Sequence, residues 1–473
     1  MTELNFKPRL QVLDQDQVDR IHSATCHILS HTGVCVTHPR ARELFAGAGA
    51  VVESDRIKIP RDLLEQTIDK VPSQVILGNR HGEPAVTLEK DASWFGATLD
   101  DIYYLDPVTG IRRQMTLEDT RSVVSLSDAL PNLTWGMTFG TISDVPAQMA
   151  DRYAARQALI YSEKPVVVSS NSADNLADII EMAKAVVTNE KAFGQAPPLA
   201  SFVTTLSPLV LPDHVVDQML LAAEEGIPQV VYNGIQAGST APMSFAGAVA
   251  QGNAETLAGL TLIQLARKNS PVIFGSFSTI MDMRSSIFSF GAPEMNLMIA
   301  AHAQIARHYD IPFYGAAGCS DAKLPDSQAA AEAMFSCFSS AMTGANLVHD
   351  TGLLEYGTMI CPEQMVLVNE LLHLVGQYMG GLPVSDETLA LDVIDAVGPG
   401  GHYLGQQHTL AHFKDVYYSG LFDRKSYPTW TSAGAKTLAT RNREQTLALM
   451  SQKPAMLDPV VLKELDRMCG HWK

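Results

Sequence analysis

Positive charge is scarce in this 473-residue sequence: 34 Lys and Arg residues stand against 51 Asp and Glu residues, a formal net charge of −17 at pH 7. Proteins that hold phosphate backbones use clustered Lys and Arg, so the composition argues against a nucleic-acid partner. The N-terminus has no signal-peptide pattern, and the apolar runs are broken by Gly, Pro or charge before they reach the length of a membrane span. We therefore expect a cytoplasmic protein.

Cysteine and metal motifs are also sparse. The six cysteines are scattered, form no CxxC pair and are too few for a disulfide framework, which agrees with a reducing compartment. His402, His408 and His412 form an H-x5-H-x3-H cluster, but no acid or thiol completes a zinc set at ligand spacing and no HExxH motif is present. We predict no metal site.

A repeated strand-then-helix pattern begins near residue 93. Eight apolar, β-branched or aromatic runs are each followed by a helical pattern, and several runs start just after a proline. The runs are 94–99, 133–142, 165–170, 199–206, 229–235, 272–278, 313–318 and 347–351, with helices starting near Thr116, Pro146, Ala173, Pro212, Ser244, Ala292, Pro325 and Pro362. Eight such units predict an α/β fold, a closed (β/α)8 TIM barrel over residues 91–382.

The alternative fold is a doubly wound open sheet, but no GxGxxG fingerprint follows the first strand. Residues 1–90 are predicted as an N-terminal α+β extension, with helices over 15–30 and 61–70 and a short strand over 34–36. Residues 383–473 are predicted as a C-terminal helical extension. Within it, a helix over 387–397 is followed by a sharp reversal at residues 398–401.

Active sites of such barrels are built from the loops that follow the strands. Those loops mix carboxylates and aromatic residues, which suits a cationic ligand, because ammonium groups lie over aromatic faces. The candidates are Asp100, Asp101, Phe202, Tyr232, Gln236, Phe277, Gly318, Cys319, His349 and Glu355. Free backbone N–H groups ahead of the helix near Asp326 could hold a carboxylate, although Asp326 itself is more simply interpreted as a helix cap. Cys319, Tyr232, Phe277 and His349 could equally be packing residues.

Five segments, in order, resemble the trimethylamine methyltransferase family over nearly the whole length. They are ILSHTGVCV with FAGAGAVVESDRIKIP in the N-terminal region, DPVTGIRRQMTLED from residue 106, GAPEMNLMIAAHAQIARHYDIP from 291, GANLVHDTGLLEYG from 344 and GPGGHYLGQQHTLAH from 398. The resemblance implies a barrel that docks a small corrinoid protein over its open face. The chain itself would bind no cofactor tightly, since its partner supplies the cobalamin.

The family's trimethylamine enzymes carry a pyrrolysine in the barrel, and this sequence has none. Trimethylamine needs its lone pair engaged before it donates a methyl group, whereas a quaternary amine already has a neutral amine as leaving group. The departure therefore points to a quaternary amine, with glycine betaine first, ahead of carnitine, proline betaine and γ-butyrobetaine. The expected reaction is an in-line attack by Co(I) of the partner's corrinoid on an N-methyl carbon, with no general base and no assigned catalytic residue.

The roles expected for the candidates follow from that substrate. We expect Tyr232, Phe277 and Phe202 to line the ammonium group, and Asp100, Asp101 and Glu355 to balance its charge. His349 and the backbone at Gly318 and Cys319 are expected to hold its carboxylate. Two hypotheses from other classes remain: a Schiff-base aldolase or lyase using Lys323, and a non-catalytic binder of a methylated amine. A homo-oligomer is also expected.

Overall fold

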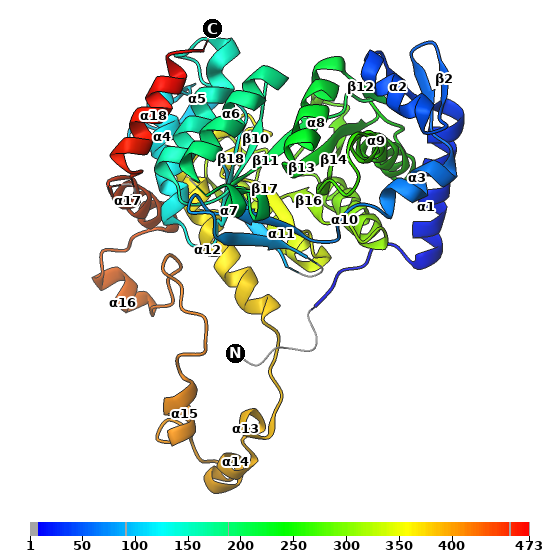
Figure 1. Cartoon of the computed structure of the whole chain (residues 1–473). Coiled ribbons are helices and arrows are strands. Elements are labelled where there is room, and N and C mark those ends of the chain that lie inside the picture. Colours follow the sequence, from blue (N-terminus) through cyan, green and yellow to red (C-terminus); the bar gives the residue numbers. More distant parts are fainter. Residues whose placement is uncertain (1–7, 90–91, 188, 454–455, 473) are drawn as a thin grey trace.

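The computed structural model describes residues 8–89, 92–187, 189–453 and 456–472. Its core is a closed barrel of eight parallel strands, paired in chain order, with the last strand bonded to the first (Figure 1). The strands are β6 (Trp94–Thr98), β9 (Trp135–Thr138), β10 (Val166–Ser169), β11 (Leu199–Thr204), β13 (Gln229–Ala237), β14 (Val272–Asp282), β16 (Phe313–Ala316) and β17 (Leu347–Thr351). The predicted (β/α)8 barrel is confirmed, and the open sheet is excluded by the pairing of β17 with β6.

Each barrel strand is followed by a helix that packs outside the barrel. These helices are α4 (Leu117–Ala129), α5 (Ala150–Tyr161), α6 (Ala173–Val186), α8 (Asp213–Glu225), α9 (Phe245–Ala266), α10 (Pro293–His308), α11 (Ser327–Thr343) and α12 (Pro362–Met379). All eight begin within a few residues of the predicted positions. Local sequence explains several starts: Thr116 and Asp119 form a reciprocal capping box on α4, and Asp326 accepts from two backbone N–H groups of α11.

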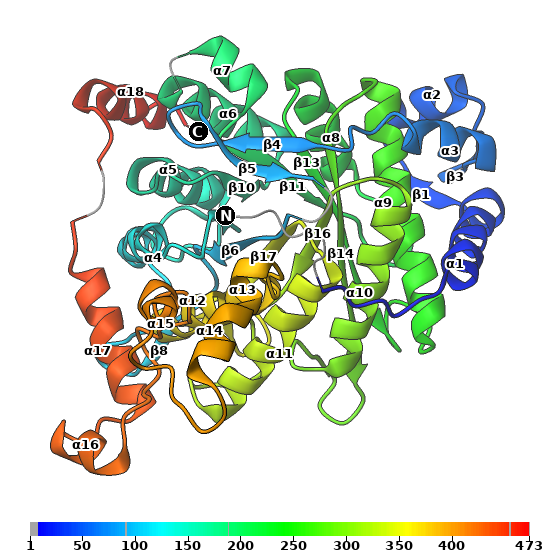
Figure 2. The ribbon, with the colours of Figure 1, turned by 90° about the horizontal axis from the view of Figure 1, so that it is seen from below.

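The N-terminal extension packs against one side and one end of the barrel. Its helices are α1 (Gln15–His27), α2 (Pro39–Gly47) and α3 (Arg61–Ile68), and its strands β1 (Val34–Val36), β2 (Val51–Glu53) and β3 (Arg56–Lys58) form a sheet with β12 (Val210–Leu211) from a barrel loop. The hairpin of β4 (Val75–Gly78) and β5 (Pro84–Leu88) lies across the end where the barrel strands begin (Figure 2). That hairpin closes the barrel end opposite the predicted site, since the backbone N–H of Gly78 donates to the carbonyl of Pro197 ahead of β11.

The C-terminal extension first leaves the body and then returns to it. Two short helices, α13 (Asp386–Leu389) and α14 (Leu391–Val397), replace the single helix predicted over 387–397. The break falls at Ala390, whose φ of 48° is left-handed, in a segment with almost no burial to favour one continuous helix. The predicted reversal at residues 398–401 is confirmed by left-handed Gly398 and Gly400. Helices α15 (Gln407–His412), α16 (Tyr427–Ser432), α17 (Leu438–Met450) and α18 (Pro459–Cys469) follow, and α17 packs on α12 and α4.

Candidate active site

Side chains that point into the barrel can be identified from strand register. In a parallel pair, residues opposite each other face the same side, and facing alternates along each strand. Tyr314 pairs with Leu347, and Ala316 pairs with His349, so these four share a side. The Tyr314 and His349 rings stack with centroids 4.6 Å apart, which places that side inside the barrel. The interior-facing residues of the other strands follow from the same register.

Those interior side chains form an aromatic cluster near the ends of the strands, buried except for the half-buried Phe139. Tyr232 is its centre, since its ring centroid lies 4.9 Å from that of Phe202, 5.7 Å from Tyr314 and His349, and 6.4 Å from Phe277. We call the set Phe139, Phe202, Tyr232, Phe277, Tyr314 and His349 the aromatic cluster. Within the described part of the chain, no Lys or Arg group is recorded over any of its rings. The predicted aromatic residues are thus brought together with two that were not predicted.

One polar contact crosses the cluster. The Tyr232 hydroxyl lies 3.2 Å from Nε2 of His349, and Nδ1 of the same imidazole lies 2.7 Å from Oδ1 of Asp350. Asp350 has a left-handed φ of 75°, at the point where the pairing of β17 with β6 shifts register. Burial raises the pKa of both Tyr232 and Tyr314 well above the usual range, so both remain neutral phenols. His349 therefore connects an aromatic surface to a buried carboxylate.

A second buried carboxyl lies nearby. Burial raises the pKa of Asp101 well above its usual range, and the neighbouring Asp100 and Asp350 carboxylates raise it further. Among the described residues, one recorded hydrogen bond lowers the pKa of Asp101, in which the backbone N–H of Ile102 donates to Oδ1 of Asp101. We call Asp101 and Asp350 the acidic pair. Electrostatically, a bound cation would favour the ionised form of Asp101.

Asp100 has a different task from Asp101. Its two oxygens accept from the backbone N–H groups of Phe139 and Thr141 at 2.9 and 2.8 Å, so it fastens the loop after β9. Other loops at this end are fastened in the same way, by Asp151 for the loop after β10 and by Glu255 for the loop after β11. Asp100 therefore helps to hold Phe139 in place, and its expected charge-balancing role stays a prediction.

Gly318 does not offer the free N–H that was expected, because its N–H donates to Oγ of Ser336 at 3.0 Å. The N-terminus of α11 is likewise occupied, since Asp326 caps it as the simpler interpretation had it. These two contacts occupy the Gly318 N–H and the α11 N-terminus, while the carboxylate role expected for the backbone at Gly318 and Cys319 stays a prediction. Cys319 is buried beside the acidic pair, and burial raises its thiol pKa well above the usual range.

Three further candidates lie toward the rim. Glu355 is paired with Arg112, whose Nε lies 2.6 Å from Oε2 of Glu355, so its charge is already balanced. The backbone N–H of Gln236 donates to the hydroxyl oxygen of Thr240 across a turn. The Lys323 ammonium is exposed and donates to the backbone carbonyl of Asp321. A Schiff-base lysine needs a desolvated setting, which this position does not provide.

The strand ends also carry residues that the sequence prediction missed. Tyr314 and Phe139 complete the aromatic cluster, and Phe290 extends it, with its ring 4.7 Å from that of Phe277. Thr98 faces the interior by register, opposite Met137, whose sulfur accepts from the Tyr314 hydroxyl. The buried Thr98 hydroxyl has no hydrogen-bond partner within the described residues, so it is available to a ligand.

An apolar rim lies along one side of this end of the barrel. It comprises exposed aliphatic and methionine side chains from four loops: Leu206, Met243, Met283, Ile287 and Leu324. The two methionines from neighbouring loops meet above Gly238. Exposed apolar side chains gathered around a site indicate a surface for another macromolecule.

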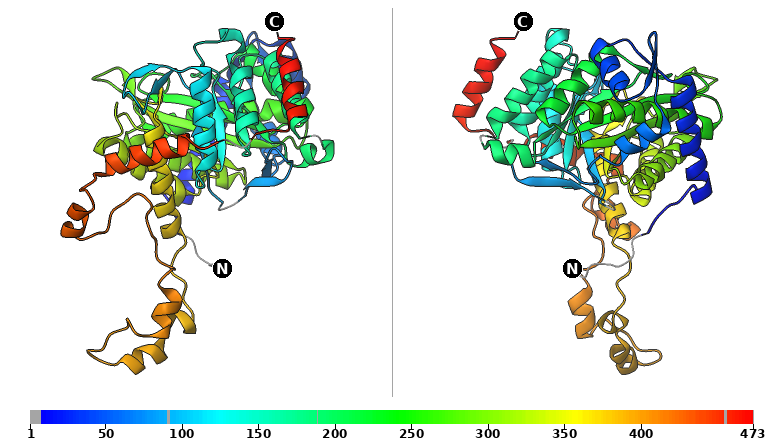
Figure 3. Two further views of the ribbon diagram at one scale, coloured as in Figure 1. Left: turned by 90° about the vertical axis from the view of Figure 1, so that its left-hand side faces the viewer. Right: turned by 45° about the vertical axis from the view of Figure 1, so that its right-hand side comes forward.

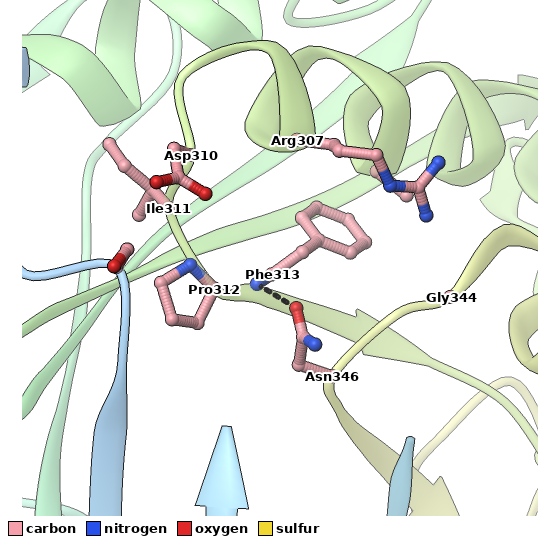
Figure 4. A pocket seen from close by; sticks show the side chains of 9 residues that line it. Arg307, Asp310, Ile311, Pro312, Phe313, Gly344 and Asn346 are labelled. Carbon is pink, nitrogen blue, oxygen red and sulfur yellow. Dashed lines mark hydrogen bonds between the residues drawn. The ribbon is translucent and has the colours of Figure 1, made fainter. Parts of the chain in front are cut away.

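A separate cavity of about 330 Å³ lies at the other end of the barrel (Figure 4). It is lined by Arg307, Asp310, Phe313 and Asn346, among others, where β16 and β17 begin. The Asn346 side chain accepts from the N–H of Phe313 at 2.8 Å, and Arg307 donates to the carbonyl of Thr343 at the end of α11. These hydrogen bonds lie at the starts of β16 and β17 and at the end of α11. The cavity therefore lies at the opposite end of the strands from the aromatic cluster.

The histidine cluster of the C-terminal extension lies far along the chain from the site. The His408 and His412 rings share a helix face, with centroids 4.4 Å apart, and His412 pairs with Asp415. Over the ranges that the structure describes, no group of three or more His, Cys, Asp or Glu side chains is placed to hold a metal. Nor is any described helix long and apolar enough to cross a membrane.

Comparison with known proteins agrees with the resemblance seen in the sequence. Residues 2–470 match the trimethylamine methyltransferase family. A glycine betaine methyltransferase of Desulfitobacterium hafniense is 32% identical over 459 residues, which cover 96% of this chain and 95% of that protein. A trimethylamine methyltransferase of the same species is 30% identical, covering 92% of this chain and 88% of its own.

Among solved structures, the monomethylamine methyltransferase of Methanosarcina barkeri aligns over 96% of this chain and 92% of its own, with 12% identity and a TM-score of 0.47. The family match spans almost all of the sequence, and the relative at 32% identity is itself named a methyltransferase. This chain belongs to the trimethylamine methyltransferase family and is a methyltransferase.

Proposed function

We propose that this chain transfers a methyl group from a quaternary amine, glycine betaine first, to the Co(I) of a corrinoid carried by a partner protein. The observation that carries the proposal is the aromatic cluster, buried at the loop end of the barrel beside the acidic pair and free of recorded Lys or Arg contacts. Aromatic faces with nearby carboxylates favour a permanent cation over a neutral amine.

The chemistry asks little of the protein beyond binding and aim. When the N–CH3 bond breaks, its electron pair stays on nitrogen and yields a neutral tertiary amine, while the partner's cobalt supplies the pair for the new bond to carbon. No proton moves, so no general base is required. The positive charge of the substrate fades along the reaction, and a dry aromatic surface favours that loss over an aqueous one. Tyr232, Phe202 and Phe277 supply that surface, since all three are buried.

The carboxylate end of a betaine needs donors, and the Gly318 N–H is already used. Two buried groups with unused hydrogen-bonding capacity are the Thr98 hydroxyl and the His349 imidazole. We assign the substrate carboxylate to the side of the barrel interior that carries Thr98 and His349. The apolar rim supports a docking partner at the same end of the barrel, because the methyl acceptor must reach the substrate from outside.

The test is a substrate panel with chemically reduced free cobalamin. Glycine betaine, carnitine, proline betaine, γ-butyrobetaine and trimethylamine are each incubated with the chain, and methylcobalamin is followed by absorbance alongside the demethylated amine. We expect turnover with a quaternary amine and none with trimethylamine. Binding without methylcobalamin from any of the five would leave only a methylated-amine binder, and turnover of trimethylamine alone would refute the quaternary substrate.

A further inference from the structure

Residues 382–418, which we call the arm, project away from the body of the molecule (Figures 1 and 3). The arm contains α13, α14 and α15. Every hydrogen bond recorded for residues 382–413 has both partners within the arm itself. Attachment to the body begins only at its return end, where Gln377 donates to the carbonyl of Asp415.

The arm carries many large apolar side chains that are exposed to solvent. Leu404 is 89% exposed and Leu382 is 83% exposed. The full set of exposed large apolar residues is Leu382, Val384, Leu389, Leu391, Ile394, Tyr403, Leu404, Leu410, Phe413, Val416 and Tyr418. Together they present on the order of 1,000 Å² of apolar surface, above the few hundred Å² contiguous on most monomers and close to what a stable interface requires.

The same chain offers a receiving surface. A groove between α10 and α11, the side groove, has a volume of about 360 Å³ and an almost wholly apolar lining that includes Leu297, Phe335, Phe338 and Met342. Leu297 and Phe335 are exposed there. The groove also lies next to the root of the arm, since the ring of Phe338 is 5.2 Å from that of Tyr378 near the end of α12.

We propose that the arm packs into the side groove of a second copy of this chain, while the second copy's arm packs into the first. Because root and groove are neighbours, one two-fold axis can satisfy both contacts, which gives a closed dimer. Charge favours this exchange over arm against arm, because residues 382–413 carry Asp386, Glu387, Asp392 and Asp395 and no Lys or Arg. Ordering such a segment costs conformational entropy, and burial on the second copy offsets that cost.

The proposal is tested by mass in solution and does not depend on methyl transfer. Sedimentation of the full chain is expected to show a dimer, and Leu404→Asp with Leu410→Asp is expected to weaken association at least 100-fold. Both residues are exposed within one chain, so circular dichroism should be unchanged. The matched control is Val460→Asp on α18, where Val460 is 77% exposed and lies outside the arm. A wild-type chain that still sediments as a monomer at about 50 micromolar, a concentration at which specific interfaces hold, overturns the proposal.

A second variant separates the groove from other receiving surfaces. Phe335→Asp places a charge in the groove, and we expect the same loss of association as in the arm variant. Mixing the arm variant with the groove variant should restore dimer, since one of the two contacts is intact in the mixed pair. Dimers that persist in Phe335→Asp, or no recovery on mixing, would show that the arm docks elsewhere.

Discussion

The loop end of the barrel and the arm both concentrate large apolar side chains, but one chain buries the first group and leaves the second exposed. Around the aromatic cluster, carboxylates such as Asp100 and Glu255 fasten several of the loops to the body of the same chain. In the arm, Ala390 is buried and the large apolar residues are not. We therefore infer a barrel site that one copy builds alone and an arm that a second copy covers.

Stability should separate the two regions most strongly. Trp135 is wholly buried inside the barrel, so Trp135→Ala is expected to lower the free energy of unfolding by about 3–5 kcal/mol. Leu382→Ala removes an exposed side chain and is expected to change it by less than about 0.5 kcal/mol in the monomeric arm variant. Urea unfolding measures both. A large loss in Leu382→Ala would mean that the arm is stabilised within its own chain.

Affinity for a permanent cation should depend on the cluster and not on aromatic residues elsewhere. Phe277→Leu keeps an apolar side chain but removes the ring, and we expect a loss of about 2 kcal/mol in binding, roughly 30-fold in Kd for glycine betaine. Phe45→Leu, in the N-terminal extension, is the matched control because Phe45 is also buried but lies outside the site. Titration calorimetry compares the two, and equal affinities would remove Phe277 from the site.

His349 should contribute less than the rings. His349→Gln loses the contact with Tyr232 and the proximity to Asp350, and a lost hydrogen bond to a ligand costs about 1–1.5 kcal/mol, roughly tenfold in Kd. Calorimetry with glycine betaine and with tetramethylammonium, which has no carboxylate, distinguishes its role. The loss should be confined to glycine betaine, and equal losses for both ligands would assign His349 to the cation instead.

The last prediction concerns the sign of a pH effect. Asp101 has a raised pKa in the fold, so the folded chain keeps this proton where the unfolded chain has lost it. The stability it contributes is complete below its ordinary value near pH 4 and is lost as the pH rises through the folded pKa. Asp101→Asn removes that dependence, so its unfolding free energy should gain on that of the wild type as the pH increases from 4 to 8.

Urea titrations at several pH values check this gain. Glu118→Gln is the control, because Glu118 is exposed on α4 and the same loss of charge should leave the pH dependence nearly unchanged. A difference between Asp101→Asn and wild type that stays constant with pH would mean that Asp101 is already ionised in the folded chain.

Sequence predicted the barrel well because its signals are local. Prolines ahead of strands and caps such as Thr116 act within a few residues, and all eight strands and helices were predicted near their observed positions. Which side chains face the interior depends on register between strands far apart in sequence. Tyr314 was missed for that reason, although it lies within a predicted run and shares its side with Ala316.

The expected roles that changed also depended on distant partners. Asp100 accepts from residues about 40 positions later, and the Gly318 N–H is taken by Ser336 from within α11. Neither contact leaves a mark in the local sequence. The shift in register that turns Asp350 toward His349 is equally hidden, because it arises from the pairing of β17 with β6.

The most direct test of the central claim compares glycine betaine with 3,3-dimethylbutanoate, which has the same shape but a carbon in place of the charged nitrogen. Calorimetric titration of the wild-type chain with each gives two dissociation constants. If the aromatic cluster and the acidic pair form a site for a permanent cation, glycine betaine binds at least about tenfold more tightly. Equal affinity for the two would contradict the account.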